Sequence, residues 1–171
     1  MKILMIEKIA RIIKNKKKLE EKLGIKITNR GKEVNIQAIP ENEYIAEKVI
    51  DALNFGFPFK IALLIKQEDF TFEIIKIKDY TKRHDLKRIR ARIIGTKGKT
   101  FGTLTNLTRC HFELKENEIG IIGAPEHIKS AQEAVVSIIQ GAKQSNVYAH
   151  LEKHQPKPIT DLGLKEDKHK L

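Results

Sequence analysis

Apolar residues along this chain follow either the alternating spacing of a strand or the spacing of a helix, and the same series of such segments occurs twice. In residues 1–65, a short apolar run precedes a helical stripe, two alternating segments on either side of Asn29-Arg30-Gly31, and further helical segments after Pro40. In residues 72–142, an alternating segment precedes two helical segments, two more alternating segments and a long apolar stripe that ends near Ala142. We therefore predict an α+β protein with two tandem modules of the order β-α-α-β-β-α.

The predicted domain boundaries follow the changes in pattern. The first module occupies residues 1–69 and the second module occupies residues 70–151. The two early helices are less clearly separated in the first module than in the second. Residues 152–171 mix Lys with Glu and Asp and contain few large apolar side chains, which is typical of a flexible charged tail.

The composition favours a polyanionic partner. The chain has 33 Lys and Arg against 22 Asp and Glu, so its formal net charge is +11. A surface this basic attracts nucleic acid or an anionic membrane. A membrane-spanning protein is not expected, because no apolar run approaches the roughly 20 residues of a transmembrane helix. No apolar segment of signal-peptide length follows Met1, which favours a cytoplasmic protein.

The residues that usually hold metals or perform catalysis are sparse. Cys110 is the only cysteine, which excludes an internal disulfide and a cysteine-based zinc site. His150 and His154 lie four residues apart, but no third ligand is evident. No nucleophile, base and orienting acid stand in a recognisable arrangement. We therefore expect no metal, no other cofactor and no enzymatic activity.

The segment Gly95-Thr96-Lys97-Gly98 lies between the two helical segments of the second module. Glycine tolerates φ > 0 and has no Cβ to obstruct a ligand, so this spacing suits a tight turn whose backbone approaches a phosphate. The N-terminus of the following helix adds N–H groups that favour an anion. Residues 82–99 contain one acid, Asp85, and eight cations: Lys82, Arg83, Lys87, Arg88, Arg90, Arg92, Lys97 and Lys99. These features favour nucleic-acid binding over a purely structural turn beside a solvated helix face.

The second module resembles a type I KH domain, because the run from Ile93-Ile94-Gly95 to Lys99-Thr100 matches the core motif of that family. A closer resemblance is to the Partner-of-NOB-one family, the Krr-related KH proteins that process small-subunit rRNA in archaea and eukaryotes. That resemblance covers residues 1–153. The segments that carry it are 91–95, 106–109, 121–123, 128–131, 141–142 and 147–153.

The resemblance implies a function and a set of partners. In type I KH domains the GxxG loop contacts the backbone of about four nucleotides of a single strand, and an apolar groove beside it receives the bases. The family implies two partners, which are single-stranded RNA from the 3′ region of small-subunit rRNA and an rRNA-processing endonuclease. A translation initiation factor is a further candidate partner. The expected function is therefore a non-catalytic RNA-binding adaptor in pre-rRNA 3′-end maturation. One alternative is a protein-interaction scaffold for the initiation factor or the nuclease, and another is an RNA-processing enzyme.

The expected RNA-binding residues surround the glycine loop: Arg90, Arg92, Ile94, Gly95, Thr96, Lys97, Gly98, Lys99, Thr100 and Arg109. Lys97 and Lys99 are the expected direct phosphate contacts. Arg90 and Arg92 cannot both face the same way on a helix, so at most one is expected to point at RNA. Arg109 is predicted to lie on a strand that lines the groove, or else to be an ordinary surface cation. Replacing both loop glycines by Asp is expected to abolish RNA binding while leaving the fold intact.

The first module lacks the glycine loop. Its corresponding segment is Ala10-Arg11-Ile12-Ile13, and the next glycine is Gly24. The backbone cannot approach a phosphate as closely there, so we hypothesise a degenerate KH module that packs against the second module and offers a protein-binding surface. A run of cations without an acid still offers electrostatic contact with RNA: Lys8, Arg11, Lys14, Lys16, Lys17 and Lys18.

Overall fold

The first module begins with a strand and a long helix. In the computed structural model, which describes residues 1–155, β1 (Lys2–Met5) leads into α1 (Ile9–Leu23), and Gly24 ends that helix in the left-handed conformation. The predicted hairpin is formed by β2 (Lys26–Arg30) and β3 (Glu33–Gln37), and the helices α2 (Pro40–Phe55) and α3 (Phe59–Gln67) follow. The strands pair antiparallel in the order β1-β3-β2.

The second module has the same sheet topology as the first, but two helices stand where the first module has α1. Its strands are β4 (Thr71–Lys76), β5 (His111–Lys115) and β6 (Glu118–Gly123), which pair antiparallel in the order β4-β6-β5. A short 3-10 turn, η1 (Ile77–Asp79), follows β4. Its helices are α4 (Leu86–Ile94), α5 (Lys99–Thr108), α6 (Pro125–Ile139) and α7 (Gln144–His154).

The α+β class and the two KH-like modules are confirmed, and the order of the elements corrects two details. Where the second module has α4 and α5, the first has the single helix α1, because no glycine interrupts its apolar stripe. Helix α7 is an addition to the predicted order. It continues to His154, three residues into the predicted tail, and residues 156–171 of that tail lie outside the described part of the chain. The predicted boundary between residues 69 and 70 falls between α3 and β4.

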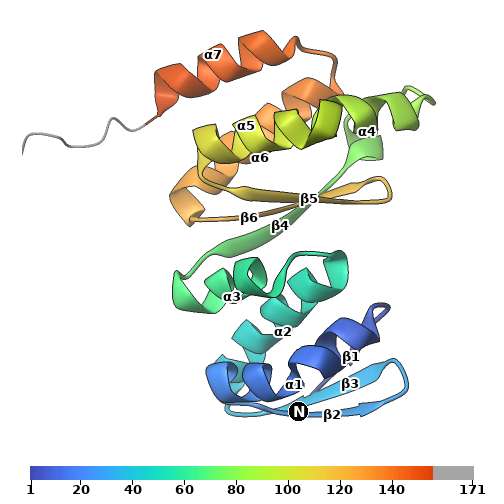
Figure 1. The fold of residues 1–171 in the computed structure, drawn as a ribbon, viewed down its shortest axis with the longest axis vertical. Coiled ribbons are helices and arrows are strands. Elements are labelled where there is room, and N and C mark those ends of the chain that lie inside the picture. Colours follow the sequence, from blue (N-terminus) through green and yellow to red (C-terminus); the bar gives the residue numbers. More distant parts are fainter. Residues whose placement is uncertain (156–171) are drawn as a thin grey trace, which may run out of the picture.

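The two modules stack as alternating layers of sheet and helix (Figure 1). The sheet of the first module lies at one end, helices α1 to α3 come next, and the sheet of the second module follows. Helices α4 to α6 cover the other face of this second sheet, and α7 lies outermost. The second sheet is therefore covered on both faces, whereas within residues 1–155 helices cover the first sheet on one face only.

Aromatic side chains fill the junction between the modules. Phe55, the last residue of α2, and Phe57, two residues later, lie against Phe72 of β4, and the three ring centroids are 5.7 to 5.9 Å from one another. A Cβ on Gly120 of β6 would lie 2.8 Å from a ring carbon of Phe55 and of Phe57. Ile122, two residues further along the same face, belongs to the core of the first module. The missing side chain at Gly120 thus lets the rings pack directly on the second sheet.

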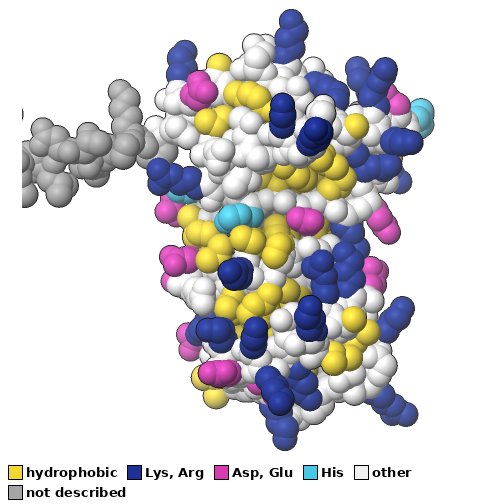
Figure 2. Space-filling model, viewed as in Figure 1, with side chains coloured by type: hydrophobic (Ala, Val, Ile, Leu, Met, Phe, Trp, Pro, Cys, Tyr) yellow, Lys and Arg dark blue, Asp and Glu magenta, His cyan; other side chains and the backbone are white. Residues whose placement is uncertain are grey.

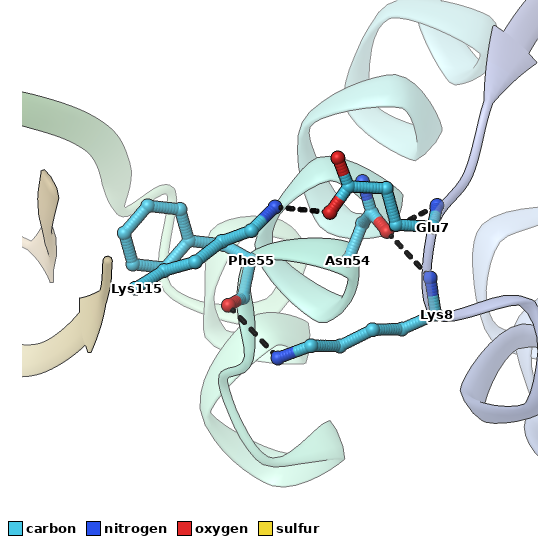
Figure 3. A network of polar contacts seen from close by, with 5 residues as sticks. All are labelled: Glu7, Lys8, Asn54, Phe55 and Lys115. Atoms are coloured by element: carbon cyan, nitrogen blue, oxygen red, sulfur yellow. Dashed lines mark hydrogen bonds and ion pairs between the residues drawn. The ribbon is translucent and has the colours of Figure 1, made fainter. Parts of the chain in front are cut away.

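Polar contacts surround this aromatic junction (Figure 3). The Asn54 Oδ1 accepts hydrogen bonds from the backbone N–H groups of Glu7 (2.9 Å) and Lys8 (3.0 Å), and the Lys8 ammonium donates to the carbonyl of Phe55 (3.4 Å). Glu7 also pairs with Lys115, at the end of β5, across 2.9 Å. The hydrogen bond and charge of Lys115 lower the pKa of the Glu7 carboxyl. One ion pair therefore links the β1–α1 connection to the second module.

Candidate nucleic-acid interface

The loop between α4 and α5 contains three residues in the left-handed region. Helix α4 ends at Gly95, whose φ is 77°, and a single 3-10 turn, η2 (Thr96–Gly98), leads into α5. Lys97 and Gly98 have φ values of 54° and 73°. This backbone turns sharply between the two helices and leaves the side chains of Thr96 and Lys97 exposed to solvent.

The two glycines of the loop have different roles. A Cβ on Gly95 would lie 2.2 Å from Oγ1 and 2.7 Å from the backbone nitrogen of Thr100, so only glycine fits there. A Cβ on Gly98 would meet no atom within 4 Å. The expectation that Asp at both positions leaves the fold intact is therefore wrong for Gly95. Gly98 is the position where the backbone lies open to an approaching ligand.

Exposed cations surround the loop. Lys97 and Lys99 are exposed, as are Lys87 and Arg88 on the preceding helix. Figure 2 shows that Lys and Arg side chains extend over both modules on the face it displays. The loop therefore lies in a field of positive charge that attracts a phosphate backbone and weakens as salt is added.

Arg90 and Arg92 point to different neighbours, as their helical spacing predicted. Arg90 donates a hydrogen bond to the side-chain oxygen of Asn117 in the β5–β6 turn. Arg92 donates to the backbone carbonyl of Ala142 at 2.8 Å and to that of Ile138 at 3.4 Å. Both side chains are half-buried. Arg92 thus joins the end of α4 to the α6–α7 connection, and Arg90 joins α4 to the hairpin.

Helix α7 supports the loop through a residue that the sequence analysis missed. The Gln144 Nε2 donates to the backbone carbonyl of Arg92 at 2.9 Å and lies 3.3 Å from the Oγ1 of Thr100, which is buried. Thr100 is also the residue against which Gly95 packs. No local sequence pattern could indicate this contact, since Gln144 lies 44 residues from Thr100. The first turn of α7 therefore holds the loop in place.

Apolar side chains lie beside the loop on α4 and α5. Ile94 is partly exposed at the end of α4, whereas the preceding Ile93 is buried in the core. Phe101, also partly exposed, stacks on Phe112 of β5 with ring centroids 5.8 Å apart. Ile94 and Phe101 thus offer apolar surface next to the glycines, as a groove for bases requires.

Arg109 does not lie on a strand, which corrects the predicted placement. It is the exposed left-handed residue that ends α5, with φ of 56°, and β5 begins two residues later at His111. Helix α5 contains ten residues, so Arg109 lies about 15 Å from Gly98 along the helix axis. The structure therefore places the expected residues from Arg92 to Thr100 at the loop or next to it, Arg90 further back on α4 against the β5–β6 turn, and Arg109 at the far end of α5.

The cations of the first module divide into two groups. Lys8 and Arg11 belong to the junction, where the Arg11 guanidinium donates to the carbonyl of Phe57 at 3.1 Å. Lys14, Lys17 and Lys18 are exposed on α1, and Lys16 is partly exposed. Within this predicted run of cations, the second group can make electrostatic contact with RNA without loosening the contacts between modules.

The histidines and the cysteine do not assemble into a metal site within residues 1–155, where no three His, Cys, Asp or Glu side chains are placed to hold a metal ion. His150 and His154 lie one helical turn apart on one face of α7, with tilted rings whose centroids are 4.3 Å apart. Burial raises the pKa of the Cys110 thiol to about 11, so the thiol is protonated at neutral pH. In the same described part of the chain, every helix is too short or too polar to cross a bilayer.

A GxxG loop between two helices, on a three-stranded antiparallel sheet backed by α6, defines a KH domain of type I. The family model of the eukaryotic-type KH domain (KH-domain type I) matches residues 71–156, and it is the model of the second KH domain of PNO1. The chain belongs to this PNO1 family of type I KH proteins, so the resemblance to Partner-of-NOB-one is confirmed.

Relatives from archaea and fungi agree with this assignment. A KH domain-containing protein of Methanocaldococcus jannaschii is 30% identical over 149 residues, which are 83% of this chain and 66% of that protein. The pre-rRNA-processing protein PNO1 of Candida albicans is 39% identical over 106 residues, which are 60% of this chain and 38% of that protein. The chain thus spans less than two thirds of the length of these relatives.

Solved structures share the whole two-module arrangement. Dim2p from Pyrococcus horikoshii superposes with a TM-score of 0.82 and 28% identity, and the match covers 89% of this chain and 98% of that one. The same protein in a complex of a/eIF2alpha, aDim2p and rRNA gives a TM-score of 0.81 and 28% identity, over 89% of this chain and 92% of that one.

Proposed function

We propose that this protein is a non-catalytic RNA-binding adaptor in maturation of the small ribosomal subunit. The observation that carries the proposal is the open left-handed backbone at Gly98 beside the exposed Lys97 and Lys99. A backbone without a Cβ approaches a phosphodiester closely, and flanking cations add attraction that depends on salt. Pre-rRNA processing is the activity named for the fungal relatives, and an rRNA complex exists for aDim2p.

In the proposed mechanism, the loop backbone, two lysines and two apolar side chains each make a different contact with the RNA. The backbone from Gly95 to Gly98, with Thr96, contacts phosphates of about four nucleotides of a single strand. Lys97 and Lys99 neutralise those phosphates and supply most of the affinity. Ile94 and Phe101 form the apolar surface against which the bases lie. Thr100, Arg90 and Arg92 act indirectly, since the buried Thr100 and the two half-buried arginines each take part in a hydrogen bond within the protein.

The proposed RNA is the 3′ region of small-subunit rRNA, and the proposed protein partners are the endonuclease that trims this rRNA and a translation initiation factor. The complex of aDim2p with a/eIF2alpha and rRNA supports an RNA partner and an initiation-factor partner. The nuclease follows from the family resemblance alone. Arg109, at the far end of α5, is proposed to contact a nucleotide beyond the four at the loop, because the helix separates it from the glycines.

A protein-interaction scaffold is the second candidate, and the open face of the first sheet favours it. On β1, Ile3 and Met5 are 59% and 68% exposed and lie on the same side of the strand. Large apolar side chains gathered on an exposed sheet face often mark an interface with another protein. In this reading the RNA contact is secondary, so abolishing it leaves binding of the partner protein unchanged.

The decisive experiment replaces Gly98 by Asp and uses Gly98→Asn as its matched control. Both residues tolerate left-handed φ and fit the open space, but only Asp brings a negative charge to the phosphate. Fluorescence anisotropy with a labelled single-stranded RNA from the rRNA 3′ end should show Gly98→Asp binding at least about tenfold more weakly than Gly98→Asn, or about 1.4 kcal/mol. Equal affinities of the two variants would contradict phosphate contact at this loop.

The non-catalytic assignment needs its own assay. Wild-type protein is incubated with the same RNA and Mg²⁺, and the RNA is analysed on a denaturing gel. Intact RNA is the expected result, because no set of residues suited to phosphodiester cleavage surrounds the loop. Cleavage that disappears in Gly98→Asp would establish an enzyme instead of an adaptor.

A further inference from the structure

A pocket lies on the α7 side of the glycine loop. Its walls come from α4, the loop, the first turns of α5, and α7. Arg88 and Lys99 contribute cations, Thr103 contributes a hydroxyl, and Gln144 and Tyr148 contribute the wall from α7. In Figure 1, α7 lies alongside α5 and α6 as the outermost layer of the stack, so it adds a wall that the α4–α5 pair alone lacks.

The pocket faces away from the side of α4 that carries Arg90. Arg88 and Arg92 are one helical turn apart and face α7, as the hydrogen bonds of Arg92 to Ile138 and Ala142 indicate. Arg90 instead reaches the β5–β6 turn. The glycine loop thus borders two surfaces, the partly exposed apolar one at Ile94 and the basic pocket beside α7.

The chemistry of the pocket suits a nucleotide. No carboxylate lines it, and its charged side chains are all cations. Arg88 and Lys99 are exposed, so they are free to move toward a phosphate. Tyr148 is partly exposed and offers an aromatic ring, on which a base of any sequence stacks. Gln144 is already held by Arg92 and Thr100, which keeps this wall fixed before RNA arrives.

We propose that this pocket binds one nucleotide that flanks those held at the glycine loop, with its phosphate beside Arg88 and Lys99 and its base against Tyr148. The inference rests on the proposed RNA-binding function and extends the path of the strand over the loop toward α7. The second module then contacts a longer single strand than its GxxG loop alone would, and α7 contributes both support for the loop and a binding surface.

The test compares RNA fragments of increasing length. The shortest fragment of the rRNA 3′ end that binds wild-type protein is first defined by truncation, and one or two nucleotides are then added at either end. For wild type, one of the extensions should raise the affinity roughly tenfold, the gain typical of one stacked base. In Tyr148→Leu this gain should vanish while the affinity for the shortest fragment is unchanged. Tyr148→Phe, which keeps the ring, should retain the gain.

A second variant tests the phosphate contact independently of the ring. Arg88→Gln should reduce the steepness of the fall of log affinity with log salt by about 0.7 for the extended fragment and by less for the shortest fragment. Lys129→Gln, an exposed cation on α6, removes the same charge elsewhere and should leave both slopes unchanged. Matching melting temperatures establish that all variants are folded.

The outcomes separate the two proposals. If wild-type protein binds no fragment, the RNA-binding function itself is wrong. If wild type binds and Tyr148→Leu shows the same gain on extension as wild type, the α7 pocket is not a nucleotide site, although the loop still binds RNA. If Tyr148→Leu lowers the affinity for all fragment lengths equally, the inference is also overturned, because Tyr148 then acts on the loop itself.

Discussion

The two sheets share one topology and differ in what lies against them. The sheet β4-β6-β5 has α6 on one face and the Phe55–Phe57 pair on the other, where Gly120 occupies the central strand. In β1-β3-β2 the equivalent outward position on the central strand is Asn35, which pairs with Ile3 and Thr28. Within residues 1–155 no helix covers that face. The size of one central side chain therefore distinguishes a sheet in the middle of the stack from a sheet at its end.

The helical layers show a second difference. Helix α1 runs unbroken for 15 residues, so its interior N–H groups are occupied by hydrogen bonds within the helix. In the second module the same stretch is divided by the loop at Gly95 to Gly98, which frees backbone for a ligand. Of two modules with the same sheet topology, one thus has a continuous helix and the other has a loop suited to phosphate.

The largest expected effect comes from placing valine on the central strand of each sheet. Gly120→Val drives a branched side chain into Phe55 and Phe57, and overpacking of this kind costs about 2 kcal/mol of the free energy of unfolding. Asn35→Val, at the equivalent position of the open sheet, should leave the free energy of unfolding unchanged or raise it slightly, because valine favours strands and no helix of residues 1–155 packs on this face. Urea unfolding followed by circular dichroism measures both.

Labelling of Cys110 reports the opening of the second module by itself, so it is a second test of the difference between the two sheets. This thiol is buried in the second module, so a thiol reagent should label it only after that module opens. In wild type the labelling and circular-dichroism midpoints should coincide, since the shared aromatic junction couples the modules. In Gly120→Val the two midpoints should separate. Equal destabilisation by Gly120→Val and Asn35→Val would refute the assigned difference between the sheets.

An intermediate effect is expected from the exposed lysines of α1. Replacing Lys14, Lys17 and Lys18 by Gln should weaken RNA binding several-fold and flatten its salt dependence, because these cations attract phosphates at no fixed position. The loss should be smaller than that caused by Gly98→Asp. The control removes three exposed cations of the first hairpin, Lys26, Arg30 and Lys32. If the control triple weakens binding as much, the effect reflects net charge alone and the α1 cations have no special role.

The smallest effect is expected from the ion pair between Glu7 and Lys115. The hydrogen bond to Lys115 lowers the pKa of Glu7 in the folded protein, so the pair stabilises above the ordinary pKa of 4.5 and this stabilisation is lost as pH falls below it. Lys115→Gln should therefore lower the urea midpoint slightly at pH 7, and the difference from wild type should disappear near pH 3. Glu7 is exposed and Lys115 is partly exposed, so high salt should also reduce the difference. A difference that grows on acidification would rule out this assignment.

The sequence predicted the fold well where the pattern is local. The hairpins, the helical stripes and the glycine loop each depend on residues within about 15 positions of one another, and each is present. Two of its errors show what a local pattern leaves out. Arg109 was placed on a strand because Cys110 and Phe112 alternate with polar residues, but the left-handed end of α5 delays the strand by two residues. Helix α7 has a polar composition, and its core contact is limited to residues such as Val147 and Leu151.

By itself, the sequence determined an α+β chain of two modules with one GxxG loop and a strongly basic composition, because periodicity, glycine and charge act over short distances. Only the tertiary structure decided which groups are free to bind a ligand and which are engaged in contacts within the protein. It turned Arg92 inward to Ala142, brought Gln144 against the loop, and set Gly120 beneath two phenylalanines. Each of these contacts joins residues more than 40 positions apart, and such contacts depend on how whole layers pack, which no local pattern encodes.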